Sequence, residues 1–194
     1  MKTKTVIAWI IILFCIDQAI KIIIDRYFLD VNFEIIPHLF YFKSTFNDKF
    51  SYINGLLNLG MGFWVHIVLF CFAFLLLIAF YDFMKFASGN AKSIDIICIF
   101  GFAGAISSLF CTIFWGGCLD YIYLKPLFVF DLKDLYINCF VVLLLIYYIR
   151  NKQRLSSVKT KDMVHHFKNR LSRNKAYIHD AGQISNQKKD NGIR

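Results

Sequence analysis

The chain has 194 residues, of which 58% are hydrophobic, and a formal net charge of +9 at pH 7. Soluble domains contain about 45–50% apolar residues, and here the apolar residues come in blocks, which excludes an ordinary soluble domain and indicates an integral membrane protein. The six cysteines lie in or beside these blocks and form no CxxC pair, so the pattern favours neither a disulfide framework nor a zinc site.

Four apolar segments come close to the ~20 residues that a helix needs to cross a bilayer core about 30 Å thick. They run over 5–24, 61–80, 94–115 and 135–149, and the last is long enough only if its helix begins near Phe130. We therefore predict an all-α integral membrane protein whose residues 1–150 form one bundle of four transmembrane helices. The first loop, 25–60, can carry short strands or an interfacial helix.

Lysine and arginine residues predict the orientation of the bundle, because they gather in cytoplasmic loops. They lie before the first span, between the second and third spans and after the fourth span: Lys2, Lys4, Lys85, Lys92, Arg150, Lys152 and Arg154. We therefore expect both termini inside and the first and third loops outside. A cleaved signal peptide is the alternative for the first span, but Phe14 stands where a cleavage box needs a small residue.

Most of the positive charge lies in residues 151–194, which we interpret as a basic cytoplasmic tail beside anionic lipid heads. Val164, Phe167 and Leu171 share one helical face and predict a short interfacial helix, whereas the chain beyond Tyr177 has the composition of a disordered segment. Nucleic-acid binding is the alternative, but the tail contains just two aromatic residues and no recognised binding module.

Asp17 and Lys21 lie four residues apart in the first span, so they share a helix face and can neutralise each other. An ionised side chain at the bilayer centre costs at least about 2.5–3.5 kcal/mol, so such residues are paired or functional. We interpret the two residues as an internal ion pair that holds the bundle together. Direct contact with a substrate is the alternative.

Polar residues converge around the third loop, where Asp120 lies before the fourth span. Asp131, Asp134 and Asn138 follow i, i+3, i+7 spacing and so form one polar stripe at the outer end of that span. Lys133 is expected to point away from this stripe and to snorkel into the headgroups. A purely structural interpretation makes Asp131 an N-cap and places Asp134 in a first turn that the helix dipole favours.

Two carboxylates that lie close together share a proton, so that one activates water while the other protonates the scissile carbonyl. This chemistry needs no metal ion and no other cofactor. The predicted spans indicate no serine–histidine or cysteine–histidine arrangement, and His66 is the only histidine in them. His165 and His166 in the tail lack further ligands at useful spacing, so no metal site is expected. Asp120 and Asp134 therefore suggest an aspartyl protease.

Two stretches of this sequence follow the pattern of a known family. Residues 104–122 run without gaps along the pattern that leads to its first catalytic aspartate, where Asp120 stands. Residues 130–134, Phe-Asp-Leu-Lys-Asp, are similar to its Phe-Asn-x-Ala-Asp motif, in which Asp134 takes the second catalytic place. The family is lipoprotein signal peptidase (signal peptidase II), a four-helix aspartyl protease of bacterial membranes, and the resemblance covers roughly residues 5–150.

Other parts of the chain match the family in some places and depart from it in others. Asp17-Gln18 and Lys21 match an Asp-Gln…Lys element, and Asn47 lies where an Asn-x-Gly-x-x-Phe-Ser motif begins, although the glycine is missing. Ser108, Cys111 and Thr112 stand where the family usually has Asn, Asp and Arg, and Asp131 replaces an Asn. The loop between the two aspartates is also shorter than usual.

The resemblance implies an endopeptidase that removes the signal peptide of bacterial prolipoproteins, before a diacylglyceryl-modified cysteine, at the outer face of the cytoplasmic membrane. Its implied partners are these prolipoproteins and membrane lipids, with no nucleic acid and no cofactor, and the protein is expected to be a monomer. Asp120 and Asp134 are the expected catalytic residues. The expected supporting residues are Asp17, Lys21, Asn47, Ser108, Asp131 and Asn138.

The alternative function is a non-catalytic membrane paralog, either a scaffold or a small transporter with an acidic outer vestibule. A transporter is expected to place its binding groups near the midplane, on interrupted helices. Here the acids gather at one edge, and Pro37 and Pro126 both lie in predicted loops. The pattern therefore favours the protease.

Overall fold

The structure is a computed structural model that describes residues 1–50, 52–88, 90–157, 168–169 and 172. The chain consists of two units, Met1–Arg150 and Asn151–Arg194, and the last helix has non-helical backbone angles at Asn151. The interfacial helix expected through Val164, Phe167 and Leu171, and the disorder expected beyond Tyr177, concern residues outside the described part of the chain.

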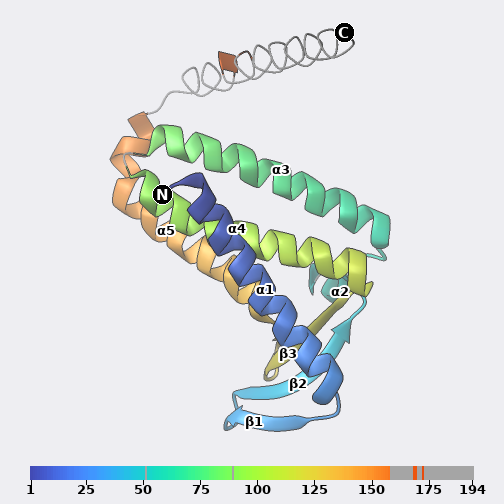
Figure 1. The fold of residues 1–194 in the computed structure, drawn as a ribbon. Helices are drawn as coiled ribbons and strands as arrows, with labels where there is room; N and C mark the ends of the chain where they lie inside the picture. Colours follow the sequence, from blue (N-terminus) through green and yellow to red (C-terminus); the bar gives the residue numbers. More distant parts are fainter. Residues whose placement is uncertain (51, 89, 158–167, 170–171, 173–194) are drawn as a thin grey trace, which may run out of the picture. The chain divides into compact units, whose positions relative to one another are not determined.

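Within the described residues, four helices are long and apolar enough to cross a membrane, which confirms the four predicted spans (Figure 1). They are α1 (Thr3–Tyr27), α3 (Phe63–Ala87), α4 (Ala91–Phe110) with the π-helical turn η1 (Cys111–Trp115), and α5 (Leu132–Ser157). A short helix, α2 (Tyr52–Leu57), precedes α3. Helix α5 begins ahead of its apolar run, as the length of the fourth span required.

In the described part of the chain, four strands form one antiparallel sheet in the order β1-β2-β3-β4. They are β1 (Asn32–Ile36), β2 (Phe40–Asn47), β3 (Cys118–Leu124) and β4 (Phe128–Phe130). Short strands in the first loop are thus confirmed, but the expectation of an all-α fold needs correction, because the third loop also forms a hairpin. The aromatic and β-branched residues of β3 favour a pleated strand, and β2 supplies the edge with which it pairs.

The pairing of β2 with β3 brings together two loops that are far apart in the sequence. Asn47 lies opposite Cys118, and Thr45 lies opposite Asp120, beyond a register shift that separates Phe42 from Thr45. A bulge of this kind bends a strand and redirects its side chains. The sheet therefore carries the end of β2 to the beginning of β3, where Asp120 lies.

The C-terminal end of α1 packs on this sheet. Ile24 forms a buried cluster with Leu119 and Tyr121, and Ile20, Phe42, Ile122 and Leu132 pack around it. Burial of side chains of this size stabilises each by about 1.5–3 kcal/mol relative to an exposed position in water. The cluster fixes α1, β3 and the start of α5 against one another.

Helix α4 is the most buried of the four spans. In its most apolar window 61% of residues are buried, compared with 22% in α1, 17% in α5 and 6% in α3. Helices α1 and α3 both pack against α4 (Figure 1). The apolar side chains that the other spans expose suit a lipid environment, because lipid tails are as apolar as leucine.

Two glycines allow α5 to approach α4 closely. A Cβ atom built on Gly101 would lie 2.9 Å from the ring of Phe140. One built on Gly104 would lie 2.6 Å from Cγ1 of Ile137 and 3.2 Å from the carbonyl oxygen of Lys133. Small residues at a helix interface serve this purpose in membrane proteins.

Gly104→Ala is therefore expected to destabilise the protein, because the added methyl group must displace Ile137 and the first turn of α5. Overpacking of this kind costs about 1–3 kcal/mol. The melting temperature of the purified protein in detergent measures the effect. Gly62→Ala is the matched control, because a Cβ atom there has no neighbour within 4 Å. An equal loss of stability in both variants would contradict the packing argument.

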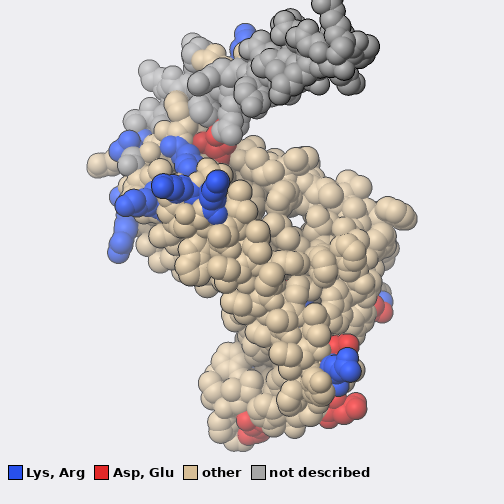
Figure 2. Space-filling view, in the orientation of Figure 1, with Lys and Arg blue, Asp and Glu red and all other residues tan. Residues whose placement is uncertain are grey.

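The charged side chains of the first unit gather at its two ends. On the face in view, Figure 2 shows a belt with few charges over the spans, mainly lysines and arginines with one acidic patch at the end that holds the N-terminus, and both acids and bases near the sheet. Lys2 is the N-cap of α1, Lys4 lies in the first turn of α1, Lys85 in the last turn of α3 and Lys92 in the first turn of α4. This distribution suits a multi-pass membrane protein.

The sequence did not indicate the buried acid that lies near the start of α4. Asp95 is fully buried, accepts a hydrogen bond of 2.6 Å from the Tyr81 hydroxyl and forms an ion pair of 3.0 Å with Lys85. It also pairs with the amino group of Met1. The cluster neutralises a carboxylate that would otherwise be costly inside a membrane span.

Candidate active site

The first turn of α5 positions two of the predicted site residues. The backbone N–H of Asp134 donates to Oδ1 of Asp131 at 3.2 Å, and the backbone N–H of Asp131 donates to Oδ2 of Asp134 at 3.3 Å. This reciprocal capping satisfies two otherwise unpaired donors at the helix start. Asp131 is therefore the N-cap, as predicted, and it fixes the direction of the Asp134 side chain.

Lys133 does not snorkel toward the headgroups, so that prediction is wrong. The residue is 8% exposed, and its Nζ lies 3.3 Å from Asp120 Oδ1, 2.9 Å from Asp131 Oδ1 and 3.4 Å from Asp134 Oδ1. Three carboxylates around one position attract a cation more strongly than water does at a partly buried site. Lys133 consequently turns back over the first turn of its helix.

Lys21 carries the charge network into the bundle. Its Nζ lies 2.8 Å from Asp17 Oδ2, which confirms the predicted pair, and 2.8 Å from Asp131 Oδ2, and all three side chains are fully buried. Gln18 Nε2 donates to Asp17 at 2.8 Å. Because Asp131 contacts both Lys21 and Lys133, acids and bases alternate from α1 to the candidate catalytic aspartates.

Asp120 is held on β3 by groups from two other elements. Its Oδ1 faces Lys133, and its Oδ2 accepts a hydrogen bond of 3.2 Å from Asn47 Nδ2 on β2. Burial raises the pKa of Asp120, the charge of Lys133 opposes this effect, and the charge of Asp131 adds to it. A carboxyl with a raised pKa can retain a proton at a higher pH than an ordinary aspartate.

The pKa of Asp131 is shifted in the opposite direction to that of Asp120. Its burial acts to raise its pKa, but the nearby charges of Lys133 and Lys21 outweigh burial and lower it. Asp131 is therefore the ionised member of the cluster, held between two ammonium groups, while Asp120 is the more easily protonated one.

Asp120 and Asp134 border the same cavity, which has a volume of about 520 Å³. Asn47, Ser108, Lys133 and Asn138 also line it, together with Cys118, Ile137, Val129, Phe50, Phe70, Phe128 and Phe130. The structure thus brings five of the eight predicted site residues to one cavity. Asp17, Lys21 and Asp131 do not line it and instead form the buried network behind it.

Turn η1 explains how α4 supplies the back of the site. Its first residues, Cys111 and Thr112, are buried, and Cys111 Sγ lies 3.3 Å from Lys21 Nζ. The Ser108 hydroxyl donates to the carbonyl oxygen of Gly104 at 2.9 Å, so its hydrogen atom is directed along the helix rather than into the cavity. Gly116 then adopts a left-handed conformation, φ 67°, that ends the helix and directs the chain into β3.

Two cysteines were missed as site residues. The contact with the Cys111 thiol, and then burial, raise the pKa of Cys118, so it remains a thiol and donates to Asp131 Oδ2 at 3.5 Å. All six cysteines belong to the described part of the chain and are free. A sequence signal existed for Cys111, because it stands in the third span where the family usually has a charged residue, Asp.

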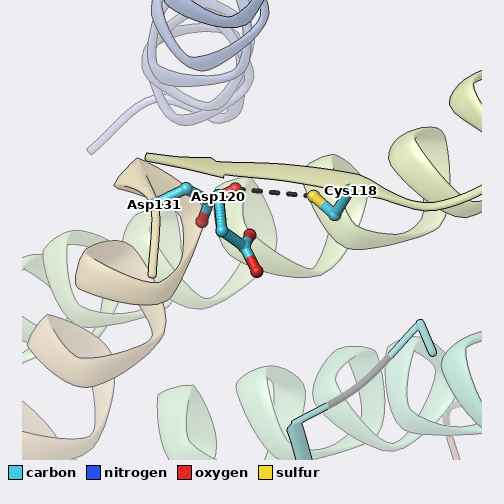
Figure 3. Close-up of side chains that lie close together, drawn as sticks. All are labelled: Cys118, Asp120 and Asp131. Atoms are coloured by element: carbon cyan, nitrogen blue, oxygen red, sulfur yellow. Dashed lines mark hydrogen bonds between the residues drawn. The ribbon is translucent and has the colours of Figure 1, made fainter. Parts of the chain in front are cut away.

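Cys118, Asp120 and Asp131 lie close enough together to bind a metal ion (Figure 3). Their sulfur and oxygen atoms lie within 4.8 Å of one another. However, Lys133 contacts both carboxylates, and Lys21 contacts Asp131 at 2.8 Å. Two ammonium groups already supply the positive charge that a metal ion would bring, so we assign no metal to this cluster.

Comparison with known proteins identifies the family. The family model for signal peptidase (SPase) II matches residues 9–150. The chain belongs to the signal peptidase II family. Membership supports a lipoprotein signal peptidase role, with peptidase activity, for this multi-pass membrane protein. A search of curated protein sequences gave no match.

Two solved structures share the fold of this family member. One, a bacterial membrane enzyme at 2.3 Å resolution, is 22% identical, has a TM-score of 0.65, and is matched over 82% of this chain and 94% of the other. A second bacterial membrane enzyme, at 1.9 Å resolution, is 18% identical with a TM-score of 0.62, over 78% of this chain and 96% of the other. At these identities the likeness concerns the fold.

Proposed function

We propose that this protein is a membrane aspartyl endopeptidase that removes the signal peptide from bacterial prolipoproteins at the outer face of the cytoplasmic membrane. One observation carries the proposal: Asp120 and Asp134, from different elements, border one cavity and contact the same ammonium group. Both lie at the end of the bundle where α1 ends and α5 begins.

The orientation follows from the positive-inside rule. Lys2, Lys4, Lys85 and Lys92 lie at or next to helix ends, at the end of the bundle opposite the sheet. That end is therefore cytoplasmic, and the sheet and the cavity face outward. Water for hydrolysis is available there, whereas the hydrocarbon core excludes it.

In the proposed reaction one carboxylate of the dyad removes a proton from a water molecule, whose oxygen bonds to the scissile carbonyl carbon. The other carboxyl group, which is protonated, donates to the carbonyl oxygen. When the tetrahedral intermediate collapses, the C–N bond breaks and the leaving nitrogen takes a proton from the dyad. Burial raises the pKa of Asp120, so this carboxyl group can serve as the protonated partner.

The cavity lining fits a lipidated, apolar substrate. Phe50, Phe70 and Phe128 contribute aromatic rings to its wall, beside a smaller number of polar side chains that include the two aspartates. A lining of this kind suits a substrate that is apolar apart from one peptide bond. The substrate lies in the bilayer before cleavage, so the cavity receives it without extracting it into water.

The test is cleavage of a synthetic prolipoprotein peptide by the purified chain in detergent, with the products identified by mass spectrometry. We expect cleavage on the N-terminal side of the diacylglyceryl-modified cysteine, and much slower cleavage of the same peptide without the lipid. Absence of cleavage for both peptides, by protein that is folded and monodisperse, would favour a non-catalytic paralog.

A further inference from the structure

Lys133 is the cation that joins the two candidate catalytic aspartates. Its Nζ contacts Asp120 at 3.3 Å, Asp134 at 3.4 Å and Asp131 at 2.9 Å, and only 8% of the residue is exposed. By contrast, the Lys49 side chain, which pairs with Asp48 in the first loop, is 61% exposed. A lysine this buried stays charged only because carboxylates surround it.

Lys133 neutralises part of the negative charge of a network of buried and half-buried acids. The groups in its network are Asp17 and Lys21 on α1, Cys111 on η1, Cys118 and Asp120 on β3, Asp131 before α5, and Asp134 on α5. Four carboxylates thus share two ammonium groups. Lys21 contacts Asp17 and Asp131, so Lys133 is the ammonium group that reaches Asp120 and Asp134.

Building on the proposed function, we propose that Lys133 is a positioning residue of the aspartate dyad, which sets the pH range in which Asp120 and Asp134 together retain one proton. Its ammonium group holds both carboxylates at one nitrogen, at the cavity wall. The family motif has Ala at this position, so the device is a property of this chain.

The physical basis is the interaction of one positive charge with the shared proton. Two carboxylates alone hold one proton up to a high pH, because removing it leaves two like charges side by side. A cation within about 4–6 Å lowers the pKa of a carboxyl by about 1–3. Of the charges that act on Asp120, Lys133 has the largest effect, and it opposes burial. Lys133 therefore moves the working range of the dyad to lower pH.

Asp131 acts in the opposite direction. Its negative charge raises the pKa of Asp120, and it shares the ammonium group of Lys133 at the shortest of the three distances. Replacing Asp131 with Asn removes that charge and leaves Lys133 to Asp120 and Asp134. The substitution also retains a good N-cap, so the variant is expected to fold.

The experiment measures kcat/KM for the diacylglyceryl-modified peptide as a function of pH, since this ratio reports on groups of the free enzyme. For Lys133→Met we expect the alkaline limb to move up by about one to three pH units, and for Asp131→Asn we expect it to move down. For Lys133→Arg, which keeps the charge, we expect the alkaline limb to stay near its wild-type position. Lys125→Met, an exposed lysine of the β3–β4 hairpin, is the matched control.

A second measurement does not depend on cleavage. Without Lys133, Asp120 and Asp134 repel each other when ionised, so the melting temperature of Lys133→Met should fall below wild type at about pH 8. The deficit should shrink toward about pH 4, as the carboxyl groups take up protons. A merely structural lysine would give a deficit that does not change with pH.

The outcomes separate the two proposals. If wild type cleaves neither peptide, the proposed function fails, and the pH dependence of the melting temperature still decides whether Lys133 sets the charge of the pair. If wild type cleaves and the alkaline limb of folded Lys133→Met stays in place, the role of Lys133 is refuted. If Lys133→Met does not fold, Lys133→Gln, which keeps hydrogen-bond donors but not the charge, takes its place, and an unmoved alkaline limb in that variant refutes the role.

Discussion

Asp120→Asn and Asp134→Asn are each expected to lower kcat/KM for the lipidated peptide by at least about 100-fold, because each removes one partner in proton transfer. The double variant should lose little more than either single variant, since the two residues act as a unit. Asn is isosteric with Asp and can still accept the hydrogen bond that Asn47 donates to position 120. Asp48→Asn, an exposed acid of the first loop, is the control.

A measurement of stability separates lost chemistry from lost folding. The pKa of Asp120 is raised in the folded state, so its ionisation disfavours folding, and this cost appears as the pH rises through the folded pKa. Asp120→Asn is free of that cost. Its melting temperature should therefore equal or exceed that of wild type at alkaline pH and approach it at acid pH. Wild-type turnover in either single Asn variant would refute the dyad.

Lys21→Met is expected to reduce the yield of folded protein sharply, because it leaves buried carboxylates without their cation. Removing one partner of a buried ion pair costs about 3–5 kcal/mol. Asp131 keeps Lys133 at 2.9 Å, but among the described residues Asp17 has Lys21 as its only ion-pair partner. The yield and melting temperature of each purified variant measure the effect.

The double variant Asp17→Asn/Lys21→Met should recover part of the loss, because it removes the carboxylate that has no other cation. Lys49→Met is the matched control, since the Lys49 side chain is 61% exposed. If Lys21→Met folds normally and cleaves poorly, the pair serves the substrate site. In that case the structural interpretation of Asp17 and Lys21 is wrong.

The features that the sequence predicted are local ones. Hydrophobic blocks determine where helices can cross a bilayer, and the spacing of Asp17 and Lys21 determines that they share a helix face. The N-cap at Asp131 likewise depends on residues within one turn. Because each signal is contained in about twenty consecutive residues, no knowledge of the fold was needed to find it.

The errors arose where contacts join distant parts of the chain. The β3–β4 hairpin was not predicted, because β3 forms by pairing with β2, which lies far away in the sequence. Asn47 likewise donates to Asp120 across 73 positions. Lys133 was expected at the headgroups because the snorkelling argument treats a single lysine side chain and ignores the acids around it. A count of the acids around it, in a site with little access to water, would have indicated a buried cation.

The sequence by itself thus determined four spans, the paired charges of the first span and the placement of Asp120 and Asp134 at one end of the bundle, because hydropathy and helical period are properties of consecutive residues. Only the tertiary structure decided which cation lies between the two aspartates, and that Lys21 reaches Asp131 and Cys111, the latter 90 positions away. The reason is that electrostatic attraction over about 3 Å depends on side chains that folding alone brings together.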